Sequence, residues 1–367
     1  MGLKKRLFNA GGGGLVPAEH FNTVTYTGNG TGQDITTVGF PTDYLWIKER
    51  TSYNDFTAFN SSDNTANNSS VFPFKQFTGF SYISTGSGGV DDFLSNGFSL
   101  KSSFDTNANG TSYVAWNWKC GGEVSVENTA TSGAMTANSV SVDGILQSSY
   151  TPSGSPGIYP KKMSVNTVAG QSLITYSGTS NSRFPHGLTS TPELVWWFTR
   201  ASGYNNTPVW SNQLGTNQTL MLGMNPARVV DASYLGSSQV PDANTIPVGT
   251  KSSTASSSYT YMCMAVHSVD GYSKVSSYTG DGSTSNAITG LGFQPRFVMI
   301  KAITRTGEWI IVDSERGEGN SMQVEDRPEN NRVAANSFTL DSDGFTVETS
   351  DSDLNTNGHI YLYYAIA

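Results

Sequence analysis

Apolar residues along the chain gather in short runs, and turn residues stand on both sides of each run. The densest runs are Tyr44–Lys48, Leu194–Phe198 and Phe297–Lys301, which are rich in aromatic and β-branched side chains. Such runs predict β-strands, and a run that is apolar at nearly every position predicts a strand buried on both faces. No long segment carries an apolar stripe of helical period. The pattern therefore predicts an all-β fold of antiparallel, jelly-roll-like β-sandwiches with almost no helix.

Three landmarks recur in the same order along the chain, and this indicates three tandem copies of one unit. A Tyr-x-Gly turn motif opens each copy, a dense apolar run follows it, and a second apolar run closes the copy. The opening tyrosines are Tyr26, Tyr176 and Tyr278, and the closing ones are Tyr113, Tyr261 and Tyr361. We expect the three closing tyrosines to occupy equivalent strands of superposable domains.

These landmarks divide the chain into five segments. Residues 1–22 are expected to be an N-terminal attachment arm, because its basic residues and four consecutive glycines cannot form a core. The predicted β-sandwich repeats are residues 23–120, 171–268 and 269–367. Residues 121–170 are rich in Gly, Ser and Pro and are expected to form an extended surface connector with room for one short strand.

The composition is polar without being strongly charged, and this excludes several classes of protein. Only 14% of the 367 residues are charged and the net charge is −8, so a nucleic-acid-binding surface, which needs a basic excess, is not expected. Two cysteines are too few for a disulfide framework or a zinc site. No apolar run reaches the roughly 18 residues of a membrane span, and no motif calls for a cofactor.

Acidic residues offer the main candidate chemistry. The triplets Asp341-Ser342-Asp343 and Asp351-Ser352-Asp353 place carboxylates at alternate positions, so each pair could share one calcium ion. The first copy lacks a matching pair, which favours solvated turns instead. A glycosidase acid and base could be drawn from Glu308, Asp313, Glu315 and Glu318. These four occur in one copy only, so we expect no enzyme and no catalytic residue. The solvated turns likewise lead us to expect no metal site.

Paired aromatic residues are the candidates for binding. Trp196-Trp197 and Tyr363-Tyr364 place one ring on each face of a strand. Trp197 and Tyr363 could therefore stack on a sugar or a neighbouring chain, while burial of both rings between layers is the alternative. We expect Trp46, Trp196 and Met299, at the centres of their apolar runs, to face the interiors of their own units.

The residues from His267 to Gly282 resemble a junction in virion proteins of marine tailed bacteriophages. The third copy continues the pattern through Gly292–Lys301 and Trp309–Ser314, and Ser164–Gly170 is similar to the linker of that family. The resemblance covers roughly residues 23–367. It departs mainly in the second copy, where Phe198-Thr199-Arg200 replaces the Ile-Lys ending of the apolar run.

This resemblance implies a virion protein, since members of the family are mostly tail fibre or virion structural proteins. We expect a non-enzymatic tail fibre or adhesin that contacts a glycan of the host surface. A capsid decoration or head-fibre protein is the alternative, and a polysaccharide-degrading virion enzyme is the second alternative. The expected location is the phage tail or capsid surface.

The N-terminal arm is the expected contact with other virion proteins of the tail, portal or capsid. Its candidate residues are Lys4, Lys5, Arg6, Leu7 and Phe8. Exposed charges contribute little to such a contact, so the two apolar side chains should matter more than the cations. Several weak contacts made together would strengthen attachment, and a homo-oligomer, by analogy with phage fibres a trimer, is expected.

Overall fold

Short β-strands make up nearly all of the regular structure. The computed structural model describes residues 15–53, 56–63, 89–200, 207–317, 319–324, 328–331 and 333–367. Its helical segments within these residues are α1 (Ser252–Ala255) and the 3-10 helices η1 (Pro17–Glu19) and η2 (Ser61–Asp63). The prediction of an all-β chain with almost no helix is confirmed.

The strands from β1 to β7, which we call the first unit, form two antiparallel sheets. A four-stranded sheet has the order β1-β7-β3-β4, and a three-stranded sheet has the order β2-β6-β5. The strands are β1 (Phe21–Thr27), β2 (Gln33–Ile35), β3 (Tyr44–Glu49), β4 (Thr57–Asn60), β5 (Val90–Leu94), β6 (Gly97–Leu100) and β7 (Ser112–Trp118).

The strands from β19 to β26, which we call the third unit, repeat this arrangement. A five-stranded sheet has the order β19-β26-β21-β22-β23, and a three-stranded sheet has the order β20-β25-β24. The strands are β19 (Ser273–Thr279), β20 (Asn286–Thr289), β21 (Phe297–Ala302), β22 (Trp309–Asp313), β23 (Ser321–Gln323), β24 (Phe338–Asp341), β25 (Gly344–Val347) and β26 (Ile360–Ile366).

The strands from β11 to β18 form the second unit. They belong to a nine-stranded sheet of order β16-β15-β14-β13-β18-β11-β10-β8-β9 and to the pair β12-β17. The strands are β11 (Gln171–Ser177), β12 (Ser182–Pro185), β13 (Leu194–Thr199), β14 (Pro208–Ser211), β15 (Gln218–Met221), β16 (Val229–Val230), β17 (Thr245–Val248) and β18 (Thr260–Val266).

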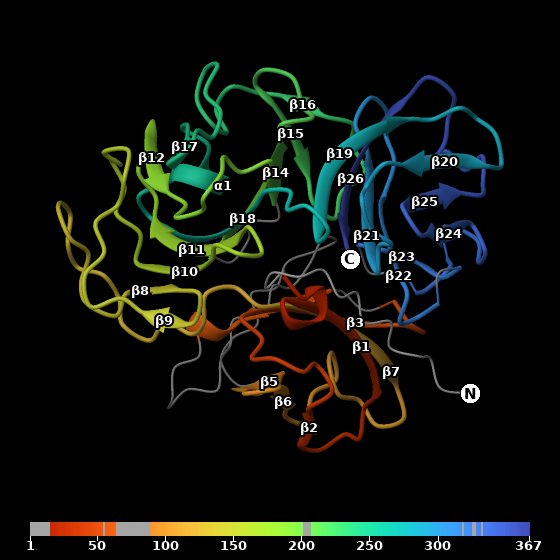
Figure 1. Cartoon of the computed structure of the whole chain (residues 1–367), viewed down its shortest axis with the longest axis horizontal. Helices are drawn as coiled ribbons and strands as arrows, with labels where there is room; N and C mark the ends of the chain where they lie inside the picture. Colours follow the sequence, from red (N-terminus) through yellow and green to blue (C-terminus); the bar gives the residue numbers. More distant parts are fainter. Residues whose placement is uncertain are drawn as a thin grey trace.

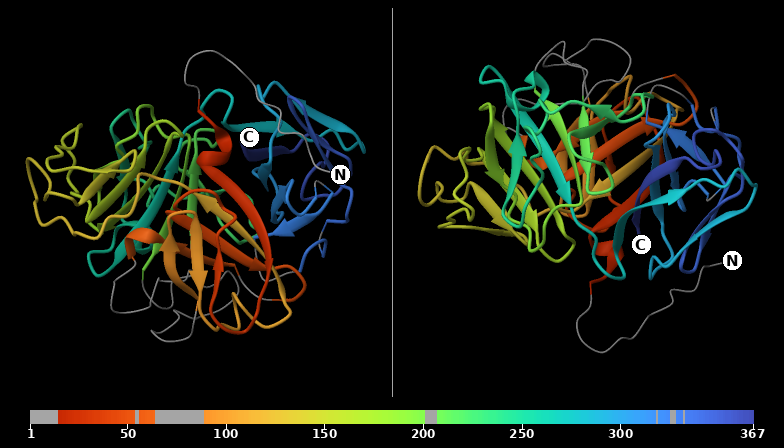
Figure 2. Two further views of the ribbon diagram at one scale, coloured as in Figure 1. Left: turned by 60° about the horizontal axis from the view of Figure 1, so that its bottom comes forward. Right: turned by 90° about the horizontal axis from the view of Figure 1, so that it is seen from above.

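One strand order therefore recurs three times. In each unit an opening strand (β1, β11 or β19) lies beside a closing strand (β7, β18 or β26), which lies beside a third strand (β3, β13 or β21). We call the sheet that holds these strands the inner sheet and the smaller one the outer sheet. Figure 1 shows the units as three lobes around one centre, and the two views of Figure 2 agree. We infer that the units are copies of one another.

Tyrosines on the opening and closing strands explain the repeated sequence motif. The two rings stack in every unit, with centroids 5.1 or 5.2 Å apart. Both hydroxyls bond to backbone atoms of the loop that precedes the closing strand. The pairs are Tyr26 with Tyr113, Tyr176 with Tyr261, and Tyr278 with Tyr361. Each pair thereby fixes this loop over the end of its inner sheet.

The glycine of the Tyr-x-Gly motif is required by close packing against the same loop. A Cβ at Gly28, Gly178 or Gly280 would lie only 2.2–2.4 Å from a backbone oxygen there. Real Cβ atoms do not approach an oxygen so closely, so each of these positions excludes a side chain. The motif recurs because the tyrosine and the glycine hold one loop together.

The stretch 121–170 is more ordered than the expected connector. It contributes β8 (Val140–Val142), β9 (Ile145–Leu146) and β10 (Lys162–Asn166). All five residues of β10 are buried, and β10 pairs antiparallel with β11. The expectation of an extended surface connector was therefore incomplete, because the free edge of the second inner sheet offers hydrogen-bond partners that a polar segment can use.

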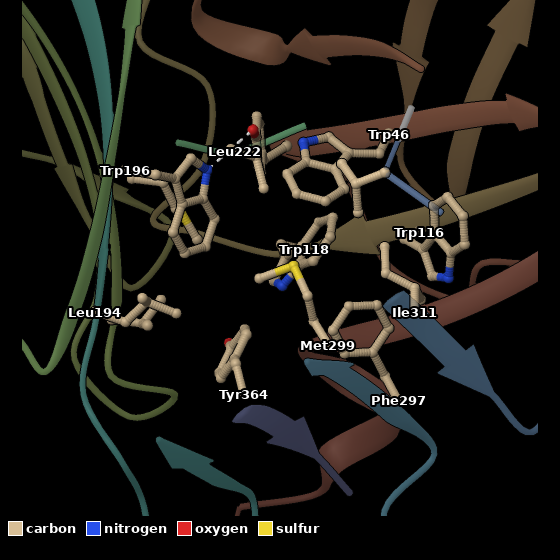
Figure 3. Close-up of a cluster of buried hydrophobic side chains, with 14 of the residues drawn as sticks. Trp46, Trp116, Trp118, Leu194, Trp196, Leu222, Phe297, Met299, Ile311 and Tyr364 are labelled. Atoms are coloured by element: carbon tan, nitrogen blue, oxygen red, sulfur yellow. Dashed lines mark hydrogen bonds between the residues drawn. The ribbon is translucent and has the colours of Figure 1, made fainter. Parts of the chain in front are cut away.

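Each third strand is buried on both faces because two different cores cover it. In β3, Leu45 and Ile47 point into a core between the inner and outer sheets of the first unit, whereas Tyr44 and Trp46 point the other way. They enter one cluster that the three units share, which we call the shared core (Figure 3). The alternation follows from the two-residue period of a strand.

The expectation that Trp46, Trp196 and Met299 face the interiors of their own units was wrong. All three lie in the shared core, and the rings of Trp46 and Trp196 are 6.3 Å apart although they belong to different units. Figure 3 shows the three side chains turned toward one another. Alternation along a strand predicts two buried faces but does not say which face meets the outer sheet.

Side-chain hydrogen bonds join each unit to both of the others. Each bond runs from a strand of one inner sheet to the neighbouring unit. The donor and acceptor pairs are Trp116 with Asp313, Trp309 with Met221, and Asn60 with Met262. Two backbone bonds repeat at matching places, from Glu329 to Arg50 and from Arg228 to Ile303. The third unit thus contacts both the second and the first, and the ring closes.

Replacing Trp46 with Ala should destabilise the chain by about 3–5 kcal/mol, because the indole is 3% exposed and fills the shared core. Urea unfolding monitored by circular dichroism measures the change. Ile145→Ala is the control, since Ile145 is 66% exposed and its loss should cost no more than about 0.5 kcal/mol. Equal effects of the two changes would contradict the placement of Trp46.

Candidate binding site at the joint of the first and third units

The aromatic residues proposed as surface contacts are buried. Trp197 is 0% exposed and Tyr363 is 4% exposed, so the prediction that they contact a ligand was wrong. Both rings pack in cores between an inner and an outer sheet, while their neighbours Trp196 and Tyr364 pack in the shared core. The arm residues Lys4, Lys5, Arg6, Leu7 and Phe8 lie outside the described residues.

The acidic turns of the third unit bind backbone and hydroxyl groups of their own surroundings. Asp343 accepts hydrogen bonds from the amides of Gly290 and Gly292, and Asp341 accepts one from the Thr346 hydroxyl. In the described part of the chain, no three His, Cys, Asp or Glu side chains are grouped so that they could hold a metal ion. No helix among the described residues is both long and apolar enough to cross a membrane.

Of the four carboxylates weighed as a glycosidase pair, Asp313 anchors a buried ionic cluster between the third and first units. Its Oδ2 accepts hydrogen bonds from Trp116 Nε1 at 3.0 Å and from Arg316 Nε at 2.6 Å. The side chains of Asp313 and Arg316 are both 0% exposed. The guanidinium also lies 5.5 Å from the Trp116 ring centroid, which adds a cation–π contact. Glu315 receives a bond from Thr25, and Glu318 is outside the described residues.

A second ion pair continues this cluster toward the surface. Arg316 donates to Glu329 Oε1 at 3.1 Å, and Arg50 of the first unit donates to Glu329 Oε2 at 2.9 Å. The Glu329 amide donates to the Arg50 carbonyl at 2.8 Å. Exposure rises along the row, since the side chains of Glu329 and Arg50 are 14% and 25% exposed. Two anions and two cations alternate, so the formal charges of these four side chains cancel.

Tyr53 lies at the outer end of this joint. Its ring is 58% exposed, and its hydroxyl accepts a 3.3 Å hydrogen bond from the Asn331 amide of the third unit. Among the aromatic residues that the structure describes, only Tyr53 and Phe104 are exposed to this degree. Sequence reasoning missed Tyr53, which stands alone after the polar residues Thr51 and Ser52. A single aromatic residue in a small polar loop was the only signal available.

The joint between the first unit and the stretch 121–170 contains a buried carboxylate to which no cation of the described residues is hydrogen-bonded. Asp43 is 2% exposed and accepts hydrogen bonds from the Ser61 hydroxyl at 2.9 Å and from the Gly122 amide at 3.0 Å. Burial raises the pKa of Asp43 to about 6, although its hydrogen bonds and the charge of Lys119 act in the opposite direction.

The fold and its joints define the class of protein: an all-β chain in which three sandwich-like units close around one shared core. The chain belongs to the family described as "Domain of unknown function (DUF7483)", whose model matches residues 16–158 and 146–367. These ranges overlap and together reach the last residue given. No curated protein and no solved structure matches the chain.

Replacing Arg316 with Met should cost about 3–5 kcal/mol of stability, because the change leaves Asp313 charged and buried without its partner. Chemical denaturation gives the difference. Lys161→Met is the matched control, since the ion pair of Lys161 with Glu127 is 3.0 Å long but lies at the surface, and it should cost less than about 1 kcal/mol. A similar small loss for Arg316→Met would show that the buried cluster does not hold the joint.

Asp43 should make folding less favourable as the pH rises. The ordinary pKa of the carboxyl is 3.8 and the folded value is about 6, so between these values the folded chain retains a proton that the unfolded chain releases. The contribution of Asp43 to stability is therefore fully present below pH 3.8 and falls by up to about 3 kcal/mol by pH 7. The stability of the wild type relative to Asp43→Asn should decline across this window. A difference that stays constant with pH would contradict the assignment.

Proposed function

We propose that the chain is a non-enzymatic structural and binding component of a bacteriophage particle, a tail fibre or adhesin that contacts the host surface. The observation that carries the proposal is that ionic side chains at the joints serve contacts between the units. The buried ion pair of Asp313 with Arg316 lies in the third unit and faces no solvent. Asp313 also accepts a hydrogen bond from Trp116 of the first unit, so the pair serves the contact between two units. A rigid body with polar loops suits recognition better than turnover.

The loops at one end of the inner sheets are polar and stiffened by local hydrogen bonds. The Asn29 side chain accepts a bond from the Thr31 amide, and Asp281 accepts one from the Ser283 amide, both at 2.8 Å. Few charges and many hydroxyl and amide groups favour a neutral, hydrogen-bonding ligand such as a glycan. These features support a contact surface at this end.

The root of the N-terminal arm lies at the opposite end of the same strands. His20 directly precedes β1, and its ring nitrogen is 2.9 Å from the Asn166 amide nitrogen. β1 and β3 both run antiparallel to β7, so Tyr53, which follows β3, lies beyond the far end of β1. A seven-residue strand spans about 20 Å. The chain could therefore attach to the particle at one end of these strands and contact the host surface at the other end.

Oligomerisation remains a prediction in this proposal. The apolar inner faces of the three sheets are already covered within one chain, so a trimer would assemble through other surfaces. The arm is the candidate, because several arms acting together multiply weak contacts.

Gold-labelled antibody against the chain should decorate the tail tips of purified particles seen by electron microscopy. Label spread over the capsid would favour a decoration or head-fibre protein instead, and absence of label from particles would contradict the virion role. Release of reducing sugar from host polysaccharide by the purified protein would favour the enzymatic alternative.

Deleting residues 1–14 should leave the chain folded but remove it from purified particles, as measured by circular dichroism and by immunoblot. The described body begins at residue 15, so the deletion spares its strands. Incorporation of the shortened chain at normal copy number would place the docking surface on the body and would contradict the attachment role.

A further inference from the structure

We propose that Tyr53 and the polar groups around it at the joint of the first and third units form a carbohydrate-binding site. The ligand class is a neutral pyranose unit of a polysaccharide, whose C–H face would lie on the exposed ring. This inference rests on the proposed function and specifies where the glycan is bound.

The exposure of the Tyr53 ring is the first observation. The seven tryptophans are all buried, and the structure leaves only Tyr53 and Phe104 among the described aromatic residues more than a third exposed. A solvent-exposed ring does not contribute the hydrophobic free energy that the buried aromatic side chains contribute. An apolar face with a polar hydroxyl at its edge is the kind of surface on which a sugar ring packs.

The orientation of the ring is the second observation. The Tyr53 hydroxyl accepts a hydrogen bond from Asn331 at 3.3 Å, so two units hold one side chain between them. Asn331 follows Glu329 by two residues. Glu329 bonds to Arg50 of the first unit through its side chain and its backbone amide. Because this framework exists before a ligand arrives, binding would lose less side-chain entropy.

Unused hydrogen-bonding capacity at Arg50, three residues before Tyr53 in the sequence, is the third observation. Arg50 donates to Glu329 through Nε and one terminal nitrogen, and its other terminal nitrogen has no partner among the described residues. The Arg50 side chain is 25% exposed, so part of it is open to a ligand. The ion pairs neutralise one another, which favours a neutral sugar over a phosphate or an acidic peptide.

Phe104 lacks this setting and therefore serves as the matched control. It is 75% exposed, but no side-chain hydrogen bond is available to orient its ring. Its described polar contact is the backbone oxygen, which accepts a bond from the Tyr113 hydroxyl within the same unit. If exposure of an aromatic ring were sufficient for sugar binding, Phe104 and Tyr53 should contribute equally. If the polar groups at the joint are also needed, only Tyr53 should contribute.

The test measures binding of envelope polysaccharide, extracted from the bacterium on which the phage grows, by isothermal titration calorimetry and saturation-transfer NMR. Tyr53→Ala should weaken binding about tenfold or more, while Tyr53→Phe, which keeps the ring and loses the Asn331 bond, should weaken it by less. Phe104→Ala should bind as the wild type does. Circular dichroism and urea unfolding confirm that the variants fold.

The possible results separate this inference from the proposed function. Wild-type binding that survives Tyr53→Ala overturns the site but leaves a glycan-binding virion protein in place. If the wild type does not bind the polysaccharide, the proposed site is also overturned. Immunogold labelling of the particles then tests the virion role separately. Loss of binding in Tyr53→Ala and not in Phe104→Ala supports the site.

Discussion

The constraint on which the structure depends is that each inner sheet is apolar on both faces. An outer sheet covers one face only, and the remaining face carries tryptophan, tyrosine, phenylalanine and methionine side chains. Leaving such a face in water would cost roughly 25 cal/mol for every Å² of apolar surface. Three inner sheets that cover one another remove this cost, and the closed ring follows from it. The joints then have to satisfy the polar groups that lie beside the shared core.

Two joints solve this problem in different ways. Between the third and first units, Asp313 is neutralised by Arg316 and bonded to Trp116. Between the first unit and the stretch 121–170, Asp43 accepts hydrogen bonds from the neutral groups of Ser61 and Gly122, and burial raises its pKa. The first joint continues to the surface and presents Tyr53 there. The proposed binding site thus lies at the end of the same row of side chains that joins the two units.

Much of the fold could be predicted from the sequence. The dense apolar runs gave the third strands, and the Tyr-x-Gly motif marked the loops that the stacked tyrosines hold. The direction of Trp46 could not be predicted, because alternation assigns neighbouring residues to opposite faces without naming what covers each face. The same limitation misplaced Trp197 and Tyr363 at the surface. Tyr53 could not be recognised either, since its importance depends on Asn331 and Glu329, which are distant in sequence.

The central claim is that three units unfold as one body because they share a core. Differential scanning calorimetry of the full chain tests this directly. We expect a single transition whose calorimetric enthalpy equals its van't Hoff enthalpy, as one cooperative unit would show. Separate transitions, or a calorimetric enthalpy two to three times the van't Hoff value, would show that the units fold independently and that the shared core does not hold them together.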